Sequence, residues 1–283
     1  MKYRLNSNLH THSDFCDGKS DPEKYILAAL EKNFTVLGFS SHAPVKIPSD
    51  WHMKKENLLN YFNTLKKLQI KYKDKIDILI GLEVDYIPGI ISPTQFKNHY
   101  TQIDYIIGSV HYLGQLSDGS YWTVDGSLEE FKLGLKGTFN NDIQKCVKKY
   151  YQLIQEMIQI SSPDIIGHLD LIKMNNINEI FFKENEDWYK DELENVTDLM
   201  AKAGCTVEIN TGGIARKKIK ALYPSEWILE IICRKKIPVI INSDAHRPEE
   251  IDGFYDNVLP IIKNIGFKQI IEFKNSKKQK VFI

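Results

Sequence analysis

The sequence predicts an α/β protein in which parallel strands, each followed by a helix, close into a barrel. Short apolar runs rich in Ile and Val recur along the 283 residues and are bounded by Gly, Pro, Asp or Asn. Such runs are typical of strands that are buried on both faces. Segments with helical spacing of apolar residues lie between them, and strand and helix alternate about seven times, which favours right-handed βα units.

The elements follow in order along the chain. Strands are expected at residues 8–12, 35–42, 76–86, 104–111, 164–170, 206–210 and 237–246, and helices at residues 20–33, 54–74, 140–160, 187–205 and 224–236. The first helix opens with a predicted capping box from Ser20 to Glu23 around Pro22, and the fourth ends at Gly204. Because no linker or repeat divides the chain, residues 1–283 are interpreted as a single domain.

Side chains that can bind metal stand at the C-terminal end of every expected strand. They are His10 and His12, His42, Glu83 and Asp85, His111, His168 and Asp170, Glu208 and Asn210, and Asp244 and His246. The C-terminal strand ends of a βα barrel meet at one mouth, where active sites are built. Of the 8 histidines only His52 and His99 lie elsewhere, and they are interpreted as surface or packing residues.

This pattern predicts a metal site with more than one ion. A single histidine at a strand end is more often structural than a ligand, but six at the same barrel face favour a shared role. The spacing of His10 and His12 places both imidazoles on one side of a strand. Imidazoles mixed with carboxylates suit Zn, Mn or Fe, and the donors exceed what one ion takes, so about two to three ions are expected. Glu83 could bridge a pair, and Cys16 is a weaker ligand candidate.

Composition excludes several other classes. Lys+Arg and Asp+Glu are both 37, so no basic excess exists to bind nucleic acid, and binding of that kind would need a local basic patch. No apolar run approaches the roughly 20 residues of a membrane-spanning helix, and the N-terminus lacks the apolar region of a secretory signal. The four cysteines contain no C-x-x-C pair and are expected to be free thiols, which fits a cytoplasmic protein. The oligomeric state is left open.

Several motifs together resemble a known superfamily. HTHSDFCDG, SSHAP, GLEVDY, GSVHYL, GHLD and SDAH occur in this order between residue 8 and about residue 250. They are similar to the motifs of the PHP (polymerase and histidinol phosphatase) superfamily, and GLEVDYIPG and DYIIGSVHYLG are similar to its histidinol-phosphate phosphatases. The resemblance implies a distorted (β/α)7 barrel and a phosphomonoesterase that hydrolyses L-histidinol phosphate to L-histidinol and phosphate in histidine biosynthesis.

The resemblance also implies a ligand set. One ion would bind His10, His12, Glu83 and Asp244, a second Asp17, His42 and His246, and a third Glu83, His111 and His168. Asp17 stands where some relatives carry His. A metal-bridging hydroxide would attack phosphorus, and Asp244, His246 or a metal-bound water would give the leaving group its proton.

Phosphate needs cations beyond the metals. Arg216 lies six residues past the sixth strand in NTGGIARKK and is the favoured clamp for the phosphoryl group, with Arg247 as its competitor. Asp85 and Asp170 are expected either to orient ligand imidazoles or to cap helices. The alternatives to a histidinol phosphatase are a PHP phosphoesterase acting on nucleotides or another small phosphate ester, and a non-catalytic metal-binding barrel.

Overall fold

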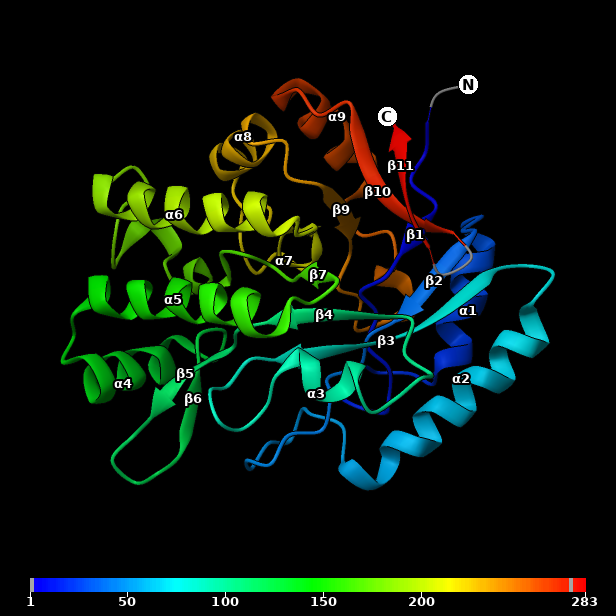
Figure 1. The fold of residues 1–283 in the computed structure, drawn as a ribbon, viewed down its shortest axis with the longest axis horizontal. Coiled ribbons are helices and arrows are strands. Elements are labelled where there is room, and N and C mark those ends of the chain that lie inside the picture. Colours follow the sequence, from blue (N-terminus) through cyan, green and yellow to red (C-terminus); the bar gives the residue numbers. More distant parts are fainter. Residues whose placement is uncertain (1–2, 275–276) are drawn as a thin grey trace.

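Parallel strands form the central barrel (Figure 1). The computed structural model describes residues 3–274 and 277–283. Within them the main sheet has the order β1-β2-β3-β4-β7-β8-β9, and all neighbouring pairs are parallel. A parallel bridge between Thr11 and Ala245 joins the first strand to the last, with the His12 amide donating to the Ala245 carbonyl at 2.8 Å. The predicted barrel of βα units is therefore confirmed.

The barrel strands are shorter than the apolar runs that predict them. They are β1 (Ser7–Asn8), β2 (Val36–Phe39), β3 (Asp77–Asp85), β4 (Tyr105–Ser109), β7 (Ile165–Ile166), β8 (Val207–Asn210) and β9 (Val239–Asn242). Except for residues 206–210, which end with β8, each run continues past its strand into a loop, and most of the predicted ligands stand on these continuations. Only Glu83 among them lies inside a regular strand.

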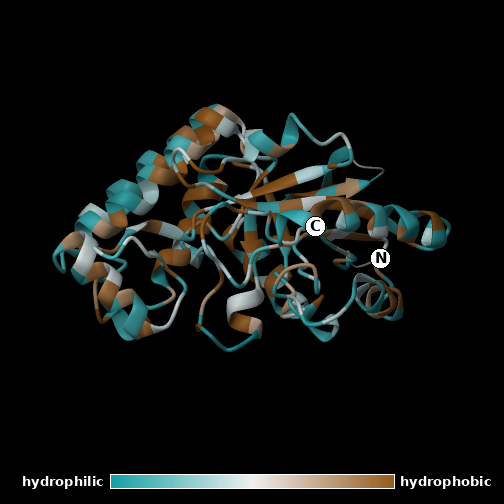
Figure 2. Ribbon diagram, turned by 90° about the horizontal axis from the view of Figure 1, so that it is seen from below, coloured by the Kyte–Doolittle hydropathy of each residue, from teal (hydrophilic) through white to brown (hydrophobic). Residues whose placement is uncertain are grey.

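Helices cover the outside of the barrel (Figure 1). They are α1 (Pro22–Glu31), α2 (Leu58–Tyr72), α3 (Pro93–Lys97), α4 (Leu128–Phe139), α5 (Ile143–Ser161), α6 (Asp187–Ala203), α7 (Gly212–Ala215), α8 (Glu226–Arg234) and α9 (Tyr255–Ile265), with 3-10 turns at Lys55–Asn57, Leu171–Lys173, Ile177–Glu179 and Pro248–Glu250. The five predicted helices correspond to α1, α2, α5, α6 and α8. Figure 2 shows hydrophilic and hydrophobic residues mixed along the outer helices. No helix among the described residues is both long and apolar enough to span a membrane.

The cap of the first helix differs from the prediction. Asp21 is the N-cap of α1, and its carboxylate accepts from the backbone N–H groups of Glu23 at 3.1 Å and Lys24 at 3.3 Å. Pro22 takes the first helical position, where its missing N–H is not needed, so the cap falls on the residue just before it. A capping box from Ser20 was therefore wrong. The predicted end at Gly204 is confirmed, because Gly204 has φ +70° at the C-cap of α6.

One end of the barrel interior is filled by apolar side chains, and the polar side chains at the strand ends lie at the other. Tyr105 lies across this interior, and a Cβ at Gly38 or at Gly81 would come within 2.4 Å of its ring or hydroxyl. Ile271 and Phe273 belong to the same buried cluster. They come from the hairpin of β10 (Gln269–Lys274) and β11 (Lys277–Phe282). A second hairpin is formed by β5 (Tyr112–Gln115) and β6 (Tyr121–Thr123). Neither hairpin was predicted from the sequence.

Candidate metal centre

The strand-end histidines and carboxylates converge as predicted. The ligand candidates that lie deepest are buried, with exposed fractions of 5% or less: His10, His12, His42, Glu83, His111 and His168. Asp17, Asp244 and His246 are half-buried and face the cavity above them. The nine predicted metal ligands therefore form one continuous cluster at the barrel mouth.

Glu83 is the centre of this cluster. Its Oε2 lies 3.1 Å from His10 Nε2, 3.4 Å from His12 Nε2 and 3.1 Å from His42 Nδ1. Burial would raise the pKa of Glu83, but the neighbouring His42 and His10 lower it well below its ordinary value. A buried carboxylate that stays ionised and faces three imidazole nitrogens is suited to bridge cations.

The second oxygen of Glu83 faces another pair of histidines. Its Oε1 lies 2.9 Å from His168 Nε2 and 3.8 Å from His111 Nε2, and it accepts a hydrogen bond of 2.6 Å from Ser109 Oγ. The carboxylate therefore joins two groups of donors, each of which has ligand atoms within 4.8 Å of one another.

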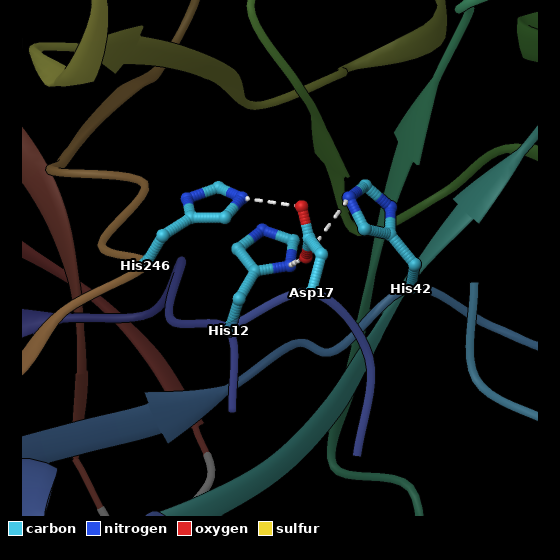
Figure 3. Close-up of side chains that lie close together, drawn as sticks. All are labelled: His12, Asp17, His42 and His246. Atoms are coloured by element: carbon cyan, nitrogen blue, oxygen red, sulfur yellow. Dashed lines mark ion pairs between the residues drawn. The ribbon is translucent and has the colours of Figure 1, made fainter. Parts of the chain in front are cut away.

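A further group surrounds Asp17 (Figure 3). Its carboxylate lies between three imidazoles, 3.5 Å from His12 Nδ1, 3.9 Å from His42 Nε2 and 3.1 Å from His246 Nε2. Burial opposes ionisation, but the hydrogen bond from His246 and the charges of His42 and His12 lower the pKa of Asp17. His12 and His42 each turn one nitrogen to this group and the other to Glu83, so the groups are contiguous.

Asp244 completes the set from a strained backbone position. Its φ is +51°, a conformation that aspartate tolerates better than most residues. From there Oδ1 reaches His10 Nε2 at 3.5 Å and His12 Nε2 at 3.3 Å. Backbone strain of this kind concentrates at functional sites.

Hydrogen bonds orient the buried imidazoles. Glu208 Oε1 lies 2.7 Å from His10 Nδ1, and Asp85 Oδ1 lies 2.7 Å from His111 Nδ1. The opposite nitrogen of each ring is thereby directed at Glu83. Asp85 thus takes the orienting role that the sequence left open. Asp170 takes neither expected role, because it pairs with Lys173 Nζ at 2.6 Å and accepts from the Ser225 amide.

His52 is a part of this arrangement that sequence reasoning missed. The structure places it in the interior, where its Nε2 lies 2.8 Å from Asp85 Oδ2 and its Nδ1 lies 2.7 Å from Ser49 Oγ. Its place in an irregular loop hid this contact, and its neighbour Trp51 in the sequence was the one available signal. His99, by contrast, is exposed as predicted, with its ring nitrogen at the Gln95 carbonyl of its own turn.

The residues fit bound metal ions. Buried atoms without a hydrogen-bond partner include His12 Nε2, Asp17 Oδ1 and His42 Nδ1, all of them directed into the cluster. Buried polar atoms are rarely left unpaired, and cations among these nitrogens and oxygens would satisfy them. The mixture of imidazole and carboxylate suits divalent transition metals. Cys16 lies 3.5 Å from His12 Nδ1 but belongs to none of the donor groups.

An open cavity of about 540 Å³ lies above the cluster. Arg216 lines it, with the guanidinium bonded to the Asp244 carbonyl and, at 3.1 Å, to Asp244 Oδ2. Gly212 makes room for this side chain, since a Cβ there would lie 2.8 Å from Arg216 Nη2. Arg247 is exposed and does not line the cavity, which favours Arg216 in the choice between the two arginines.

Comparisons with known proteins identify relatives that match most of the chain. The family model described as PHP domain matches residues 8–212. The chain is 28% identical over 273 residues to a Deinococcus radiodurans protein named "Probable histidinol-phosphatase", covering 95% of this chain and 97% of that protein. It is 27% identical over 264 residues to the histidinol-phosphatase of Bacillus subtilis, covering 88% of this chain and 97% of that one.

A solved structure has the same fold. The histidinol phosphate phosphatase of Lactococcus lactis, complexed with zinc, L-histidinol and phosphate, superimposes with a TM-score of 0.76 at 22% identity, covering 98% of this chain and 100% of that one. The family model covers well over half of the chain, and the matched residues include His10, His12, His42, Glu83, His111 and His168, whereas Asp244 and His246 lie beyond them. The protein is therefore a member of the PHP domain family.

Proposed function

We propose that the protein is a metal-dependent phosphomonoesterase that hydrolyses L-histidinol phosphate to L-histidinol and phosphate. The observation that carries this proposal is the contiguous set of donors around Glu83 at the floor of an open cavity. Relatives named histidinol-phosphatase that match nearly the whole length of the chain support the choice of substrate.

We assign the donors to three ion positions. The first comprises His10, His12, Glu83 and Asp244, the second Asp17, His42 and His246, and the third Glu83, His111 and His168. The donor groups that the geometry brings together support this division, with His12 facing the first and second positions. The donor chemistry favours Zn, Mn or Fe over Ca or Mg.

The side chains around the ions divide the remaining work. Bound divalent ions would activate water and polarise the phosphoryl oxygens. Arg216 lines the cavity beside Asp244 and would hold the phosphoryl group with its planar fork. Asp244 and His246 also line it and would return a proton to the oxygen of the leaving alcohol.

The proposed setting is the cytoplasm, with residues 1–283 acting as one domain on a small molecule and not on nucleic acid. The free state of all four cysteines supports the compartment. The bridge from Thr11 to Ala245 and the insertion of Ile271 and Phe273 into the barrel interior support a single unit.

The test is phosphate release by metal-loaded protein from L-histidinol phosphate, nucleoside monophosphates and a phosphodiester. L-Histidinol phosphate should give the highest kcat/KM. A higher value for the nucleoside monophosphates would replace the proposal with a PHP phosphoesterase acting on nucleotides. Metal-loaded protein that hydrolyses none of the esters would favour a non-catalytic barrel.

A further inference from the structure

Asp125 is a carboxylate in the cavity with no partner among the described residues. It follows β6 and is half-buried, and it lines the same cavity as Glu83 and Arg216. No residue of the ranges 3–274 and 277–283 forms a hydrogen bond or an ion pair with its side chain. A partly buried carboxylate is unfavourable unless its charge is paired, so this arrangement indicates that a cationic group of a ligand pairs with Asp125.

Asp125 shares the wall of this cavity with His111 and Tyr223. Burial raises the pKa of Tyr223, and the charges of Asp170 and Asp125 add to this effect. Asp125 and Tyr223 therefore face the same part of the cavity.

The hydroxyl of Tyr223 is a second polar group of this cavity that lacks a hydrogen-bond partner. The residue is 3% exposed and lines the cavity, yet its buried hydroxyl has no hydrogen-bond partner. Its backbone is paired with Asn210, and a Cβ at Gly213 would lie 2.6 Å from Tyr223 Cε2, so the ring is held in place. An unpaired buried hydroxyl is unfavourable, and a ligand atom would relieve it.

The other cavity carboxylates outside the metal centre differ from Asp125. Glu130 accepts from the Ser127 amide at 2.7 Å in the capping box of α4. Asp50 is exposed at the cavity rim. Arg216 is already paired with Asp244 and does not neutralise Asp125. Asp125 is therefore the half-buried carboxylate of this cavity that is free to receive a cation.

We propose that Asp125 and Tyr223 bind the ammonium group of the substrate and make the enzyme selective for phosphate esters of amino alcohols. The inference rests on the proposed function. In L-histidinol phosphate the ammonium is on the carbon next to the one that carries the ester oxygen, so it must lie beside the metal centre when the phosphoryl group is bound there. The Asp125 carboxylate neutralises the charge, and the Tyr223 hydroxyl oxygen accepts a further N–H.

The test compares L-histidinol phosphate with the phosphate ester of imidazolylpropanol, which differs only in lacking the ammonium. A charge-assisted contact changes kcat/KM by about ten- to a hundred-fold. Wild-type enzyme should prefer the ammonium-bearing ester by this factor, and Asp125→Asn should lose most of the preference. Tyr223→Phe should lose a smaller part, because its hydroxyl carries no charge.

Binding of the product provides a readout independent of catalysis. Asp125→Asn should weaken binding of L-histidinol, measured by calorimetry, about ten- to a hundred-fold and leave the metal content unchanged. Asp50→Asn, which removes an exposed carboxylate from the rim of the same cavity, should keep both the wild-type preference and the wild-type affinity.

The outcomes separate the inference from the proposed function. If wild-type enzyme hydrolyses L-histidinol phosphate but Asp125→Asn retains the preference, or loses activity equally on both esters, ammonium binding by Asp125 is refuted. If wild-type enzyme hydrolyses both esters equally well, selectivity for the ammonium is refuted. If metal-loaded wild-type enzyme hydrolyses neither ester, the proposed function itself fails.

Discussion

Replacing Arg216 by Ala should slow the hydrolysis of L-histidinol phosphate without removing the metal ions. The guanidinium is mostly buried, with 18% of its side chain exposed, and lies 3.1 Å from Asp244 Oδ2 at the cavity wall. A charge-assisted contact to the phosphoryl group contributes about 1.5–3 kcal/mol. Its loss corresponds to about ten- to a hundred-fold in kcat/KM.

The metal content should stay at the wild-type level because Arg216 contacts Asp244 and supplies no ligand atom itself. Arg216→Lys should restore only part of the activity, because lysine retains the charge but lacks the planar fork. The assay is steady-state phosphate release beside elemental analysis. Arg247→Ala is the matched control, since Arg247 is exposed outside the cavity and should have no effect.

Two results would refute this reasoning. Unchanged kinetics for Arg216→Ala with a large loss for Arg247→Ala would transfer the phosphate-binding role to Arg247. A loss of metal from Arg216→Ala equal to its loss of activity would show that the arginine supports Asp244 as a ligand and does not act on the substrate.

Three further perturbations test the cluster beneath the cavity. His10→Ala and His111→Ala should each lose metal and activity together, whereas the exposed His99→Ala should lose neither, and a sensitive His99 would contradict the strand-end interpretation. Asp85→Asn should lower metal affinity or activity about ten- to a hundred-fold, and His52→Phe should have a smaller effect on both. Wild-type metal affinity in Asp85→Asn would exclude the orienting role of Asp85. In the folded, metal-free protein the pKa of His111 is about 10, above its ordinary value of 6.5, because the Asp85 carboxylate stabilises the protonated ring. The pair therefore stabilises the fold fully below pH about 6.5, and this stability is lost as pH rises through about 10. Between pH 7 and pH 10 the Tm of metal-free wild type should therefore fall further than the Tm of metal-free His111→Ala. An equal fall in both proteins would be evidence against the pair.

The strand-end ligands could be predicted because two features of the sequence constrain them, the apolar runs and the alternation of strands with helices. Apolar runs locate the strands, and parallel βα units bring all C-terminal strand ends to one mouth. Residues as distant as His10 and Asp244 were thus placed together without knowledge of any loop. The structure confirms the convergence, with 3.5 Å between His10 Nε2 and Asp244 Oδ1.

Features that depend on loop paths could not be predicted in the same way. His52 reaches Asp85 from an irregular segment with no periodicity, and Asp125 follows a hairpin strand that the sequence reading did not identify. The contact between Arg216 and Asp244 depends on the missing Cβ of Gly212 and on the left-handed backbone at Asp244. Neither local propensity nor burial pattern encodes such contacts.

The metal content of the protein tests the central claim most directly. Elemental analysis of metal-replete wild type should give about two to three transition-metal ions per chain, because the donors around Glu83 exceed the needs of one ion. Glu83→Ala should lower this number, since both of its oxygens face ligand imidazoles. One ion or fewer in the wild type, or an unchanged number in Glu83→Ala, would contradict a multinuclear centre bridged by Glu83.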